Sequence, residues 1–218
     1  MGVVDRRPLI AVPKGRILED IRPLFEEVGI QLPDTRKESR RMVFDDPGSD
    51  FRFFMLRGSD VPTYVEAGVA DLGIAGLDVL EENKFSFYMP VDLKVGACTM
   101  CVIGKEGDDP SFRRNGRSLR VATKFPNIAK QYFAEKGTPV ELINLHGNIE
   151  LAPLMGLADC VVDLVATGET LRKNGLKAYH RFLDVSARLV CNRASYRLRF
   201  AELKPLFEQL TEVVAKRA

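Results

Sequence analysis

The sequence predicts a soluble α/β protein built from two lobes. Strand-like and helix-like segments alternate along the 218 residues, and the strand-like segments are short apolar runs, typical of strands that are buried on both faces. The alternation is interrupted near residue 104 and begins again near residue 120. Hydrophobic residues make up 45% of the chain, which is enough for one large core or two small ones.

The first series of elements is delimited by glycines and capping residues. Gly29 and Gly68 each follow an amphipathic segment and are expected to end a helix. Ser59 or Asp60 is expected to cap the second helix, and Asp78 the third. The expected elements are a strand at 9–12, a turn at 13–16, a helix at 17–28, a strand at 51–56, a helix that ends at Gly68, and a strand at 71–74.

The second series has the same pattern and is followed by a return to the first lobe. Its expected elements are strands at 121–123, 140–145 and 161–165, and helices at 127–136, at 150–155 and before Gly175. An apolar strand at 91–103, a polar loop at 104–118, a strand at 186–192 and a closing amphipathic helix complete the chain. We therefore assign residues 1–93 and 183–218 to lobe I, and 94–182 to lobe II, with a ligand cleft expected between the lobes.

Charge and cysteine content exclude several classes of protein. The chain has 32 basic and 30 acidic residues, a net charge of +2 that is too balanced for a nucleic-acid or membrane-surface protein. No apolar run is long enough for a signal peptide or a membrane span, so a cytoplasmic location is expected. The four cysteines lie in apolar strand-like segments and are expected to be free core residues.

The segment 161–176, with the sequence VVDLVATGETLRKNGL, points to a sugar-phosphate site. An apolar strand containing Asp163 is followed by a small, hydroxyl-rich loop that leads into a helix. Backbone amides at a helix N-terminus bind anions, and Asp163 can accept hydrogen bonds from ribose hydroxyls or bind a metal ion. The alternative is an ordinary turn in which threonines cap the helix, and for this motif alone that alternative is the better one.

Motifs in six segments span nearly the whole chain: PKGRI at 13–17, ESRRMVF at 38–44, SDVPTYVEAGVADLGIAG at 59–76, VATKFPNIA at 121–129, ELAPLMGLADCVVDLVATGETLRKNGL from residue 150, and SARLVCNRASY at 186–196. Together these segments resemble the short-form ATP phosphoribosyltransferases, the first enzymes of histidine biosynthesis. The resemblance implies a two-lobed fold similar to that of the periplasmic binding proteins.

The resemblance also implies a reaction. The family joins N1 of the adenine of ATP to C1 of 5-phosphoribosyl 1-pyrophosphate (PRPP), and releases pyrophosphate in the presence of Mg²⁺. Adenine N1 already has a free lone pair, so no general base is needed. Stabilisation of the leaving group falls to Mg²⁺, held mainly by substrate phosphates, and to arginines. Arg16 and Arg40 are the leading catalytic candidates, with Lys14 as an assisting charge.

The remaining site residues follow from motif position. The resemblance directs Glu150 and Asp163 to the ribose or its Mg²⁺, and the loop Ala166, Thr167, Gly168, Glu169 and Thr170 to the 5-phosphate. Arg16, Asp71 and Asp78 are the candidates for ATP binding, although for Asp78 a plain helix cap is slightly the better alternative. The chain departs from the family pattern at Ala166, where short forms commonly have an acid, and at Asn148, where they commonly have a serine.

The resemblance also implies regulation by a partner protein, and two alternative functions remain open. The sequence stops soon after its closing helix, so the histidine-binding domain of the long forms is expected to be absent. The resemblance then implies a hetero-oligomer with a regulatory subunit similar to histidyl-tRNA synthetase, and a dimer of catalytic chains. The first rival is a non-catalytic two-lobed module that binds a small molecule. The second is a phosphoribosyltransferase that acts on another base.

Overall fold

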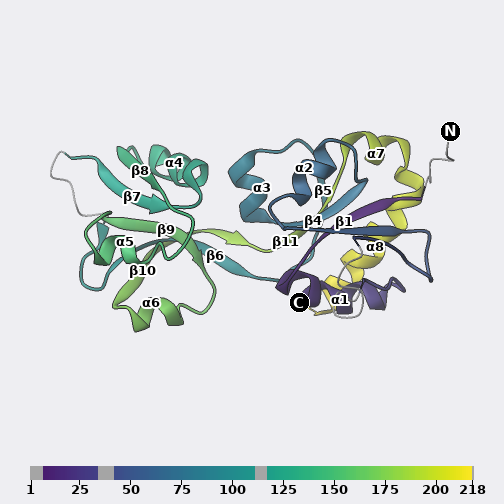
Figure 1. The fold of residues 1–218 in the computed structure, drawn as a ribbon, viewed down its shortest axis with the longest axis horizontal. Helices are drawn as coiled ribbons and strands as arrows, with labels where there is room; N and C mark the ends of the chain where they lie inside the picture. The colour runs from purple at the N-terminus through teal and green to yellow at the C-terminus, as the bar shows by residue number, and fades with distance from the viewer. Residues whose placement is uncertain (1–6, 34–41, 111–116, 218) are drawn as a thin grey trace. The chain divides into compact units, whose positions relative to one another are not determined.

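The computed structural model describes residues 7–33, 42–110 and 117–217. Contacts divide the chain into two compact units, each built around its own sheet (Figure 1). Unit 1 comprises Met1–Leu80, Lys84–Gly96 and Ser186–Ala218, and unit 2 comprises Glu81–Asn83 and Ala97–Val185. The chain therefore passes from unit 1 to unit 2 near Gly96 and returns near Val185. Residues 81–83, at the end of one helix, are also assigned to unit 2.

Unit 1 contains a mixed sheet of six strands. The central strand pairs in parallel with a neighbour on each side, and the other pairings are antiparallel. In spatial order the strands are β2 (Val43–Asp45), β3 (Arg52–Leu56), β1 (Leu9–Pro13), β4 (Leu72–Gly76), β11 (Ala187–Cys191) and β5 (Tyr88–Asp92). Because β1, β3 and β4 run in the same direction, the loops that follow them leave from one edge of the sheet.

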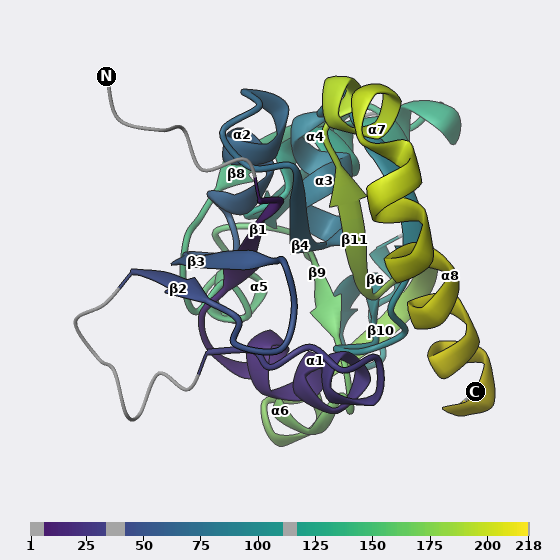
Figure 2. The same ribbon diagram turned by 90° about the vertical axis from the view of Figure 1, so that its right-hand side faces the viewer.

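Helices cover both faces of this sheet. Helices α1 (Arg16–Glu27) and α8 (Phe200–Arg217) contribute to one core cluster, and α2 (Val61–Glu66) contributes to the cluster on the other face (Figure 2). Helices α3 (Leu77–Asn83) and α7 (Arg193–Leu198) complete the unit. The expected closing helix is confirmed, and its predicted apolar positions are all buried: Leu203, Leu206, Phe207, Leu210, Val213 and Val214.

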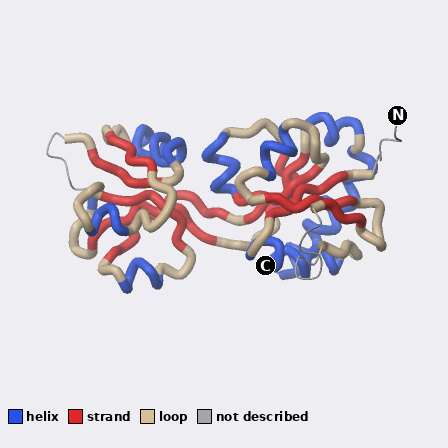
Figure 3. The backbone as a smooth tube through the Cα atoms, viewed as in Figure 1, coloured by secondary structure: helices blue, strands red, loops and turns tan. Residues whose placement is uncertain are grey.

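Unit 2 contains a five-stranded mixed sheet (Figure 3). In spatial order the strands are β10 (Leu176–Val185), β6 (Cys98–Lys105), β9 (Cys160–Val165), β7 (Leu119–Thr123) and β8 (Val140–Asn144). Strand β7 pairs in parallel with β8 and β9, whereas β6 is antiparallel to β9 and β10. The helices are α4 (Pro126–Glu135), α5 (Leu151–Leu154) and α6 (Glu169–Lys173).

The single strand expected at 91–103 is wrong, because two strands occupy the segment. Strand β5 ends at Asp92 and β6 begins at Cys98. Between them Lys94 and Gly96 have φ values of 57° and 63°. These left-handed conformations are incompatible with a continuous strand, and the chain leaves unit 1 for unit 2 at this point.

Three elements were not predicted from the sequence, and one of the predicted caps is wrong. The missed elements are β2, β10 and α7. Asp60 is the N-cap residue of α2, as predicted, although its side chain makes no capping hydrogen bond, whereas the N-cap of α3 is Gly76 rather than Asp78. Asp78 lies in the first turn of α3, with its Oδ1 folded against Gly76.

The four cysteines are free, as expected, and three of them are buried. Within the described ranges no helix is long and apolar enough to cross a membrane.

Candidate active site

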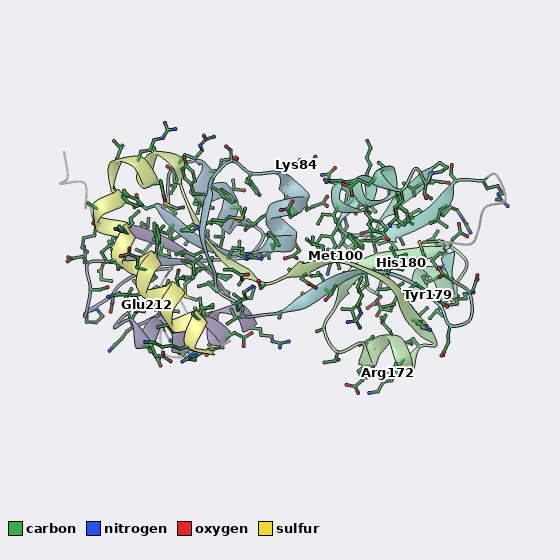
Figure 4. The ribbon with its side chains drawn as sticks, turned by 180° about the vertical axis from the view of Figure 1, so that it is seen from behind. Lys84, Met100, Arg172, Tyr179, His180 and Glu212 are labelled. Atoms are coloured by element: carbon green, nitrogen blue, oxygen red, sulfur yellow. The ribbon has the colours of Figure 1, made fainter. Side chains whose placement is uncertain are left out.

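The loop between β9 and α6 holds its shape through contacts of its own. Gly168 has φ 70°, a left-handed conformation that glycine adopts without strain and that turns the chain into α6. The backbone N–H of Glu169 donates to Thr167 Oγ1 at 3.4 Å, and Arg172 Nη1 donates to the Thr167 carbonyl at 3.2 Å. Arg172, which Figure 4 labels on α6, therefore ties the helix back to the loop.

A cavity of about 250 Å³ in unit 2 brings together every residue that the sequence assigned to PRPP. Its wall contains Glu150, Asp163, Ala166, Thr167, Gly168, Glu169 and Thr170. The rest of the wall is apolar, from β6, β9, α6 and Ile149 at the start of α5: Ile103, Ile149, Val161, Leu164, Val165 and Leu171. The cavity thus combines an apolar floor with carboxylates, hydroxyls and loop amides, which is the usual composition of a small-molecule site.

The hydrogen-bond donors that this loop offers to an anion do not belong to a long helix. Helix α6 has only five residues and none of them is buried, so its dipole adds little to anion binding. Thr167, Glu169 and Thr170 are exposed, and Gly168 is partly exposed. An anion at this loop would therefore be bound by amides and hydroxyls of the loop itself, in the manner of a backbone nest.

Asp163 has a basic neighbour that the sequence analysis missed. Strands β7 and β9 are parallel, and Thr123 lies opposite Val162, so Lys124 and Asp163 come next to each other at the end of the sheet. Lys124 Nζ lies 3.3 Å from Asp163 Oδ1. The spacing of 39 residues between them carries no local signal, and the pairing could be found only by knowing which strands are adjacent.

In unit 1, two of the predicted cationic residues follow the first strand. Strand β1 ends at Pro13, and Lys14 then donates its backbone N–H to the Leu56 carbonyl at 2.8 Å. Gly15, at φ 94°, precedes the first residue of α1, which is Arg16. The Arg16 side chain is 84% exposed, and the one ion pair it makes among the described residues is a loose i,i+4 contact to Asp20 at 3.5 Å, so its guanidinium can reach a ligand. Arg40 lies outside the described residues.

The structure argues against Asp71 as a ligand of ATP. Its carboxylate accepts hydrogen bonds from the Leu9 N–H at 2.9 Å, from Ser195 Oγ at 2.7 Å and from Arg199 Nη1 at 3.0 Å. It precedes β4 and contacts the start of β1, so it lies at the opposite edge of the sheet from Lys14 and Arg16. We therefore assign Asp71 a structural role, which the motif alone did not reveal.

Asp78 lies at the other edge of the sheet, where β4 passes into α3. Its Oδ1 is so close to Gly76 that a Cβ added there would lie 2.2 Å from it. Since β1 and β4 are parallel, the ends of both strands are at the same edge, the usual location of ligands in open α/β sheets. Asp78 therefore remains a candidate.

A second charged group in unit 1 also went unnoticed in the sequence. Asp92 accepts hydrogen bonds from Ser186 Oγ at 2.6 Å and from the Lys94 N–H at 3.1 Å, and forms ion pairs with Lys94 and Arg188. Burial alone would raise the pKa of Asp92, but the hydrogen bonds from Lys94 and Ser186 and the charge of Arg188 outweigh it and lower this pKa.

Comparison with known proteins agrees with the resemblance in the sequence. The profile of the HisG family, ATP phosphoribosyltransferase, matches residues 57–212. An ATP phosphoribosyltransferase from Syntrophotalea carbinolica is 46% identical over 95% of both chains. Another, from Geobacillus kaustophilus, is 48% identical over 94% of this chain and 97% of its own.

Solved structures show the same relationship. The ATP phosphoribosyl transferase (HisG:HisZ) complex from Thermotoga maritima contains a chain that is 33% identical, with a TM-score of 0.78 over 96% of this chain and 99% of that one. The periplasmic aliphatic sulphonate binding protein SsuA from Escherichia coli is 13% identical with a TM-score of 0.60, a likeness of fold alone that confirms the predicted fold class. The chain belongs to the ATP phosphoribosyltransferase family, and its length matches that of the short-form relatives.

Proposed function

We propose that this chain transfers the 5-phosphoribosyl group of PRPP to N1 of the adenine of ATP, the first step of histidine biosynthesis, and that the cavity at Ala166–Thr170 binds the phosphoribosyl group. Family membership supports the reaction. The observation that supports the location is the presence, in the wall of one cavity, of all seven residues that the sequence assigned to PRPP. The binding-protein neighbours are too distant in sequence to support a non-catalytic function.

The proposed reaction needs little proton transfer and much stabilisation of charge. The adenine N1 lone pair forms a bond to C1 of the ribose, and the bond from C1 to the pyrophosphate oxygen breaks with its electron pair on the leaving group. Because C1 becomes cationic and the leaving group gains charge, fixed donors near both are the main source of rate enhancement. In this proposal the exposed guanidinium of Arg16, assisted by Lys14 and by Arg40, stabilises the pyrophosphate.

In the cavity the loop would bind the 5-phosphate. In this proposal the amides of Gly168 and Thr170 and the hydroxyls of Thr167 and Thr170 donate to the phosphate, and Glu150 and Asp163, which line the same cavity, accept from the ribose hydroxyls. For ATP, Arg16 and Asp78 remain the candidates in unit 1.

The described residues fit a Mg²⁺ that is bound mainly by substrate. Within them, no three His, Cys, Asp or Glu side chains are placed so that they could bind a metal together. Mg²⁺ commonly keeps its waters and binds one or two carboxylates plus substrate phosphates, and Asp163 or Glu150 could provide such a carboxylate. When bound, the ion would neutralise charge on the pyrophosphate.

Two further parts of the proposal concern partners and location. The Thermotoga maritima structure is a complex of HisG with HisZ, and we propose an equivalent hetero-oligomer with a regulatory subunit for this chain. A dimer of catalytic chains and a cytoplasmic location stay predictions.

The direct test is to mix the purified chain with ATP, PRPP and Mg²⁺ and to quantify phosphoribosyl-ATP and pyrophosphate by mass spectrometry, with and without the regulatory subunit. We expect both products in equal amounts. Binding of ATP and PRPP without turnover in either mixture would favour the binding module. Free adenine or another base replacing ATP as acceptor would favour the second rival.

A further inference from the structure

We infer that Lys124 is a positioning residue of the phosphoribosyl site, where it fixes the Asp163 carboxylate and compensates its charge, an inference that rests on the proposed function of the cavity. Lys124 is not part of the cavity wall, whereas Asp163 is. Its Nζ lies 3.3 Å from Asp163 Oδ1. Lys124 therefore acts on the site through Asp163.

Asp163 has a buried carboxylate oxygen, and this explains why it needs a basic partner. Its Oδ1 is buried and, among the described residues, has no partner in hydrogen-bond geometry. A buried carboxylate oxygen without any compensation is costly, and Lys124 offers the charge contact nearest to it. The side chain of Asp163 is still 24% exposed and lines the cavity, so this residue can meet a ligand there.

The backbone around Lys124 is fixed by a buried threonine. Thr123 is fully buried, and its Oγ1 donates to the Val162 carbonyl at 2.8 Å and accepts from the Phe125 N–H at 2.9 Å. These bonds join the end of β7 to β9 and close the turn that contains Lys124. The Nζ also lies 5.1 Å from the centre of the Phe125 ring. The Lys124 side chain, which is 43% exposed, thus contacts both the Phe125 ring and the Asp163 carboxylate from a turn whose backbone is fixed.

This arrangement has a consequence for an anionic substrate. PRPP carries several negative charges, and an uncompensated carboxylate beside the phosphate loop would repel it. With Lys124 present, Asp163 can accept hydrogen bonds from the ribose at a lower electrostatic cost. Loss of Lys124 should therefore weaken PRPP binding, while the chemical step, which depends on groups at the leaving pyrophosphate, should change little.

The experiment is a double-mutant cycle on steady-state kinetics with ATP saturating. We expect Lys124→Met to raise the KM for PRPP about tenfold, the size expected for an acceptor that loses its charged partner, with little change in kcat. Lys124→Arg should restore most of the loss. In an Asp163→Asn background, Lys124→Met should add almost nothing, because the carboxylate on which it acts is gone. Lys130→Met, a change of an exposed lysine on α4, is the matched control and should leave the KM unchanged.

Three results would overturn the inference. They are an unchanged KM in Lys124→Met, full additivity with Asp163→Asn, which would mean that Lys124 contacts PRPP directly, and no rescue by arginine. Thermal unfolding of each variant shows whether it is folded. Lys124→Gln, a second variant without the ammonium group, is measured in the same double-mutant cycle. If the wild-type protein does not transfer the phosphoribosyl group at all, the proposed function fails instead.

Discussion

Replacement of Asp71 by alanine distinguishes a structural role of this residue from a role in binding ATP. The substitution removes the acceptor of three hydrogen bonds, from the Leu9 N–H, Ser195 Oγ and Arg199 Nη1. The Asp71 side chain is 17% exposed, so its partners lose bonds that water replaces only in part. We expect a protein that is less stable and that binds ATP normally below its melting temperature.

The expected loss in the free energy of unfolding follows from the kinds of hydrogen bond that are lost. Two donors are neutral and contribute about 1 kcal/mol each, and the guanidinium bond contributes about 2 kcal/mol, for a total of about 4 kcal/mol. Arg199 keeps its contacts to Glu202 at 2.8 and 2.9 Å, so it is not left as an isolated charge and the loss stays below that of a stranded ion. In a protein of this size such a loss lowers the Tm by roughly 10 °C.

The assay is thermal unfolding of wild type and Asp71→Ala, together with the KM for ATP at 25 °C. Asp45→Ala is the control, because Asp45 also pairs with arginine, here with Arg7 and Arg52, but is 50% exposed. Exposed ion pairs contribute little, so this control should stay within about 3 °C of wild type. A normal Tm combined with a clearly raised KM for ATP in Asp71→Ala would refute the structural role.

Three further predictions concern the proposed site and its surroundings. Arg16→Ala, and likewise Arg40→Ala, should lower turnover by roughly 10² to 10³ without changing the Tm, because each removes a donor to the leaving group; unchanged turnover would remove that residue from the mechanism. Ala166→Asp should tighten PRPP binding, measured by calorimetry, if position 166 reaches the ribose or Mg²⁺, and an unchanged affinity would make it a spectator. Because the pKa of Asp92 is lowered from its ordinary 3.8, its stabilising contribution is complete above that pH and is lost as the pH falls through the lower, folded-state value. Asp92→Asn should therefore reduce stability at pH 7 and flatten its acid dependence in urea unfolding between about pH 5 and 2, and equal slopes for both proteins would contradict this.

The sequence predicted those elements whose periodicity is strong. Helix α8 shows six buried residues at helical spacing, and β1, β3, β7 and β9 are short apolar runs, so both kinds of element can be recognised locally. Strand β10 was missed because polar residues such as Lys177, His180 and Arg181 interrupt its apolar pattern, and the register of its pairing with β6 shifts twice. Its stability comes from the neighbouring strand rather than from its own sequence.

For the candidate site, the sequence identified the residues along one loop but not their long-range partners. The predicted residues of the cavity wall come from one motif plus Glu150, which local pattern and resemblance could indicate, whereas Ile103 and Ile149 of the same wall were not predicted. The contact of Lys124 with Asp163 and that of Arg199 with Asp71 join segments far apart in the chain. Such pairs depend on which strands and helices become neighbours. The motif that contains Asp71 therefore suggested a ligand where the fold has a structural carboxylate.

The charges around the cavity determine how an aspartate in place of Ala166 would change PRPP binding. Three carboxylates, Glu150, Asp163 and Glu169, line a site that we propose for a polyanion. Two of them already have basic partners: Lys173 lies 2.7 Å from Glu169, and Lys124 lies 3.3 Å from Asp163. An aspartate at position 166 would be a fourth carboxylate, and neither lysine would be available to it. It can tighten PRPP binding only if ribose hydroxyls or Mg²⁺ compensate its charge, and otherwise repulsion must weaken binding. Tighter binding that requires Mg²⁺ would therefore place the metal at this loop, and tighter binding without it would place the ribose there.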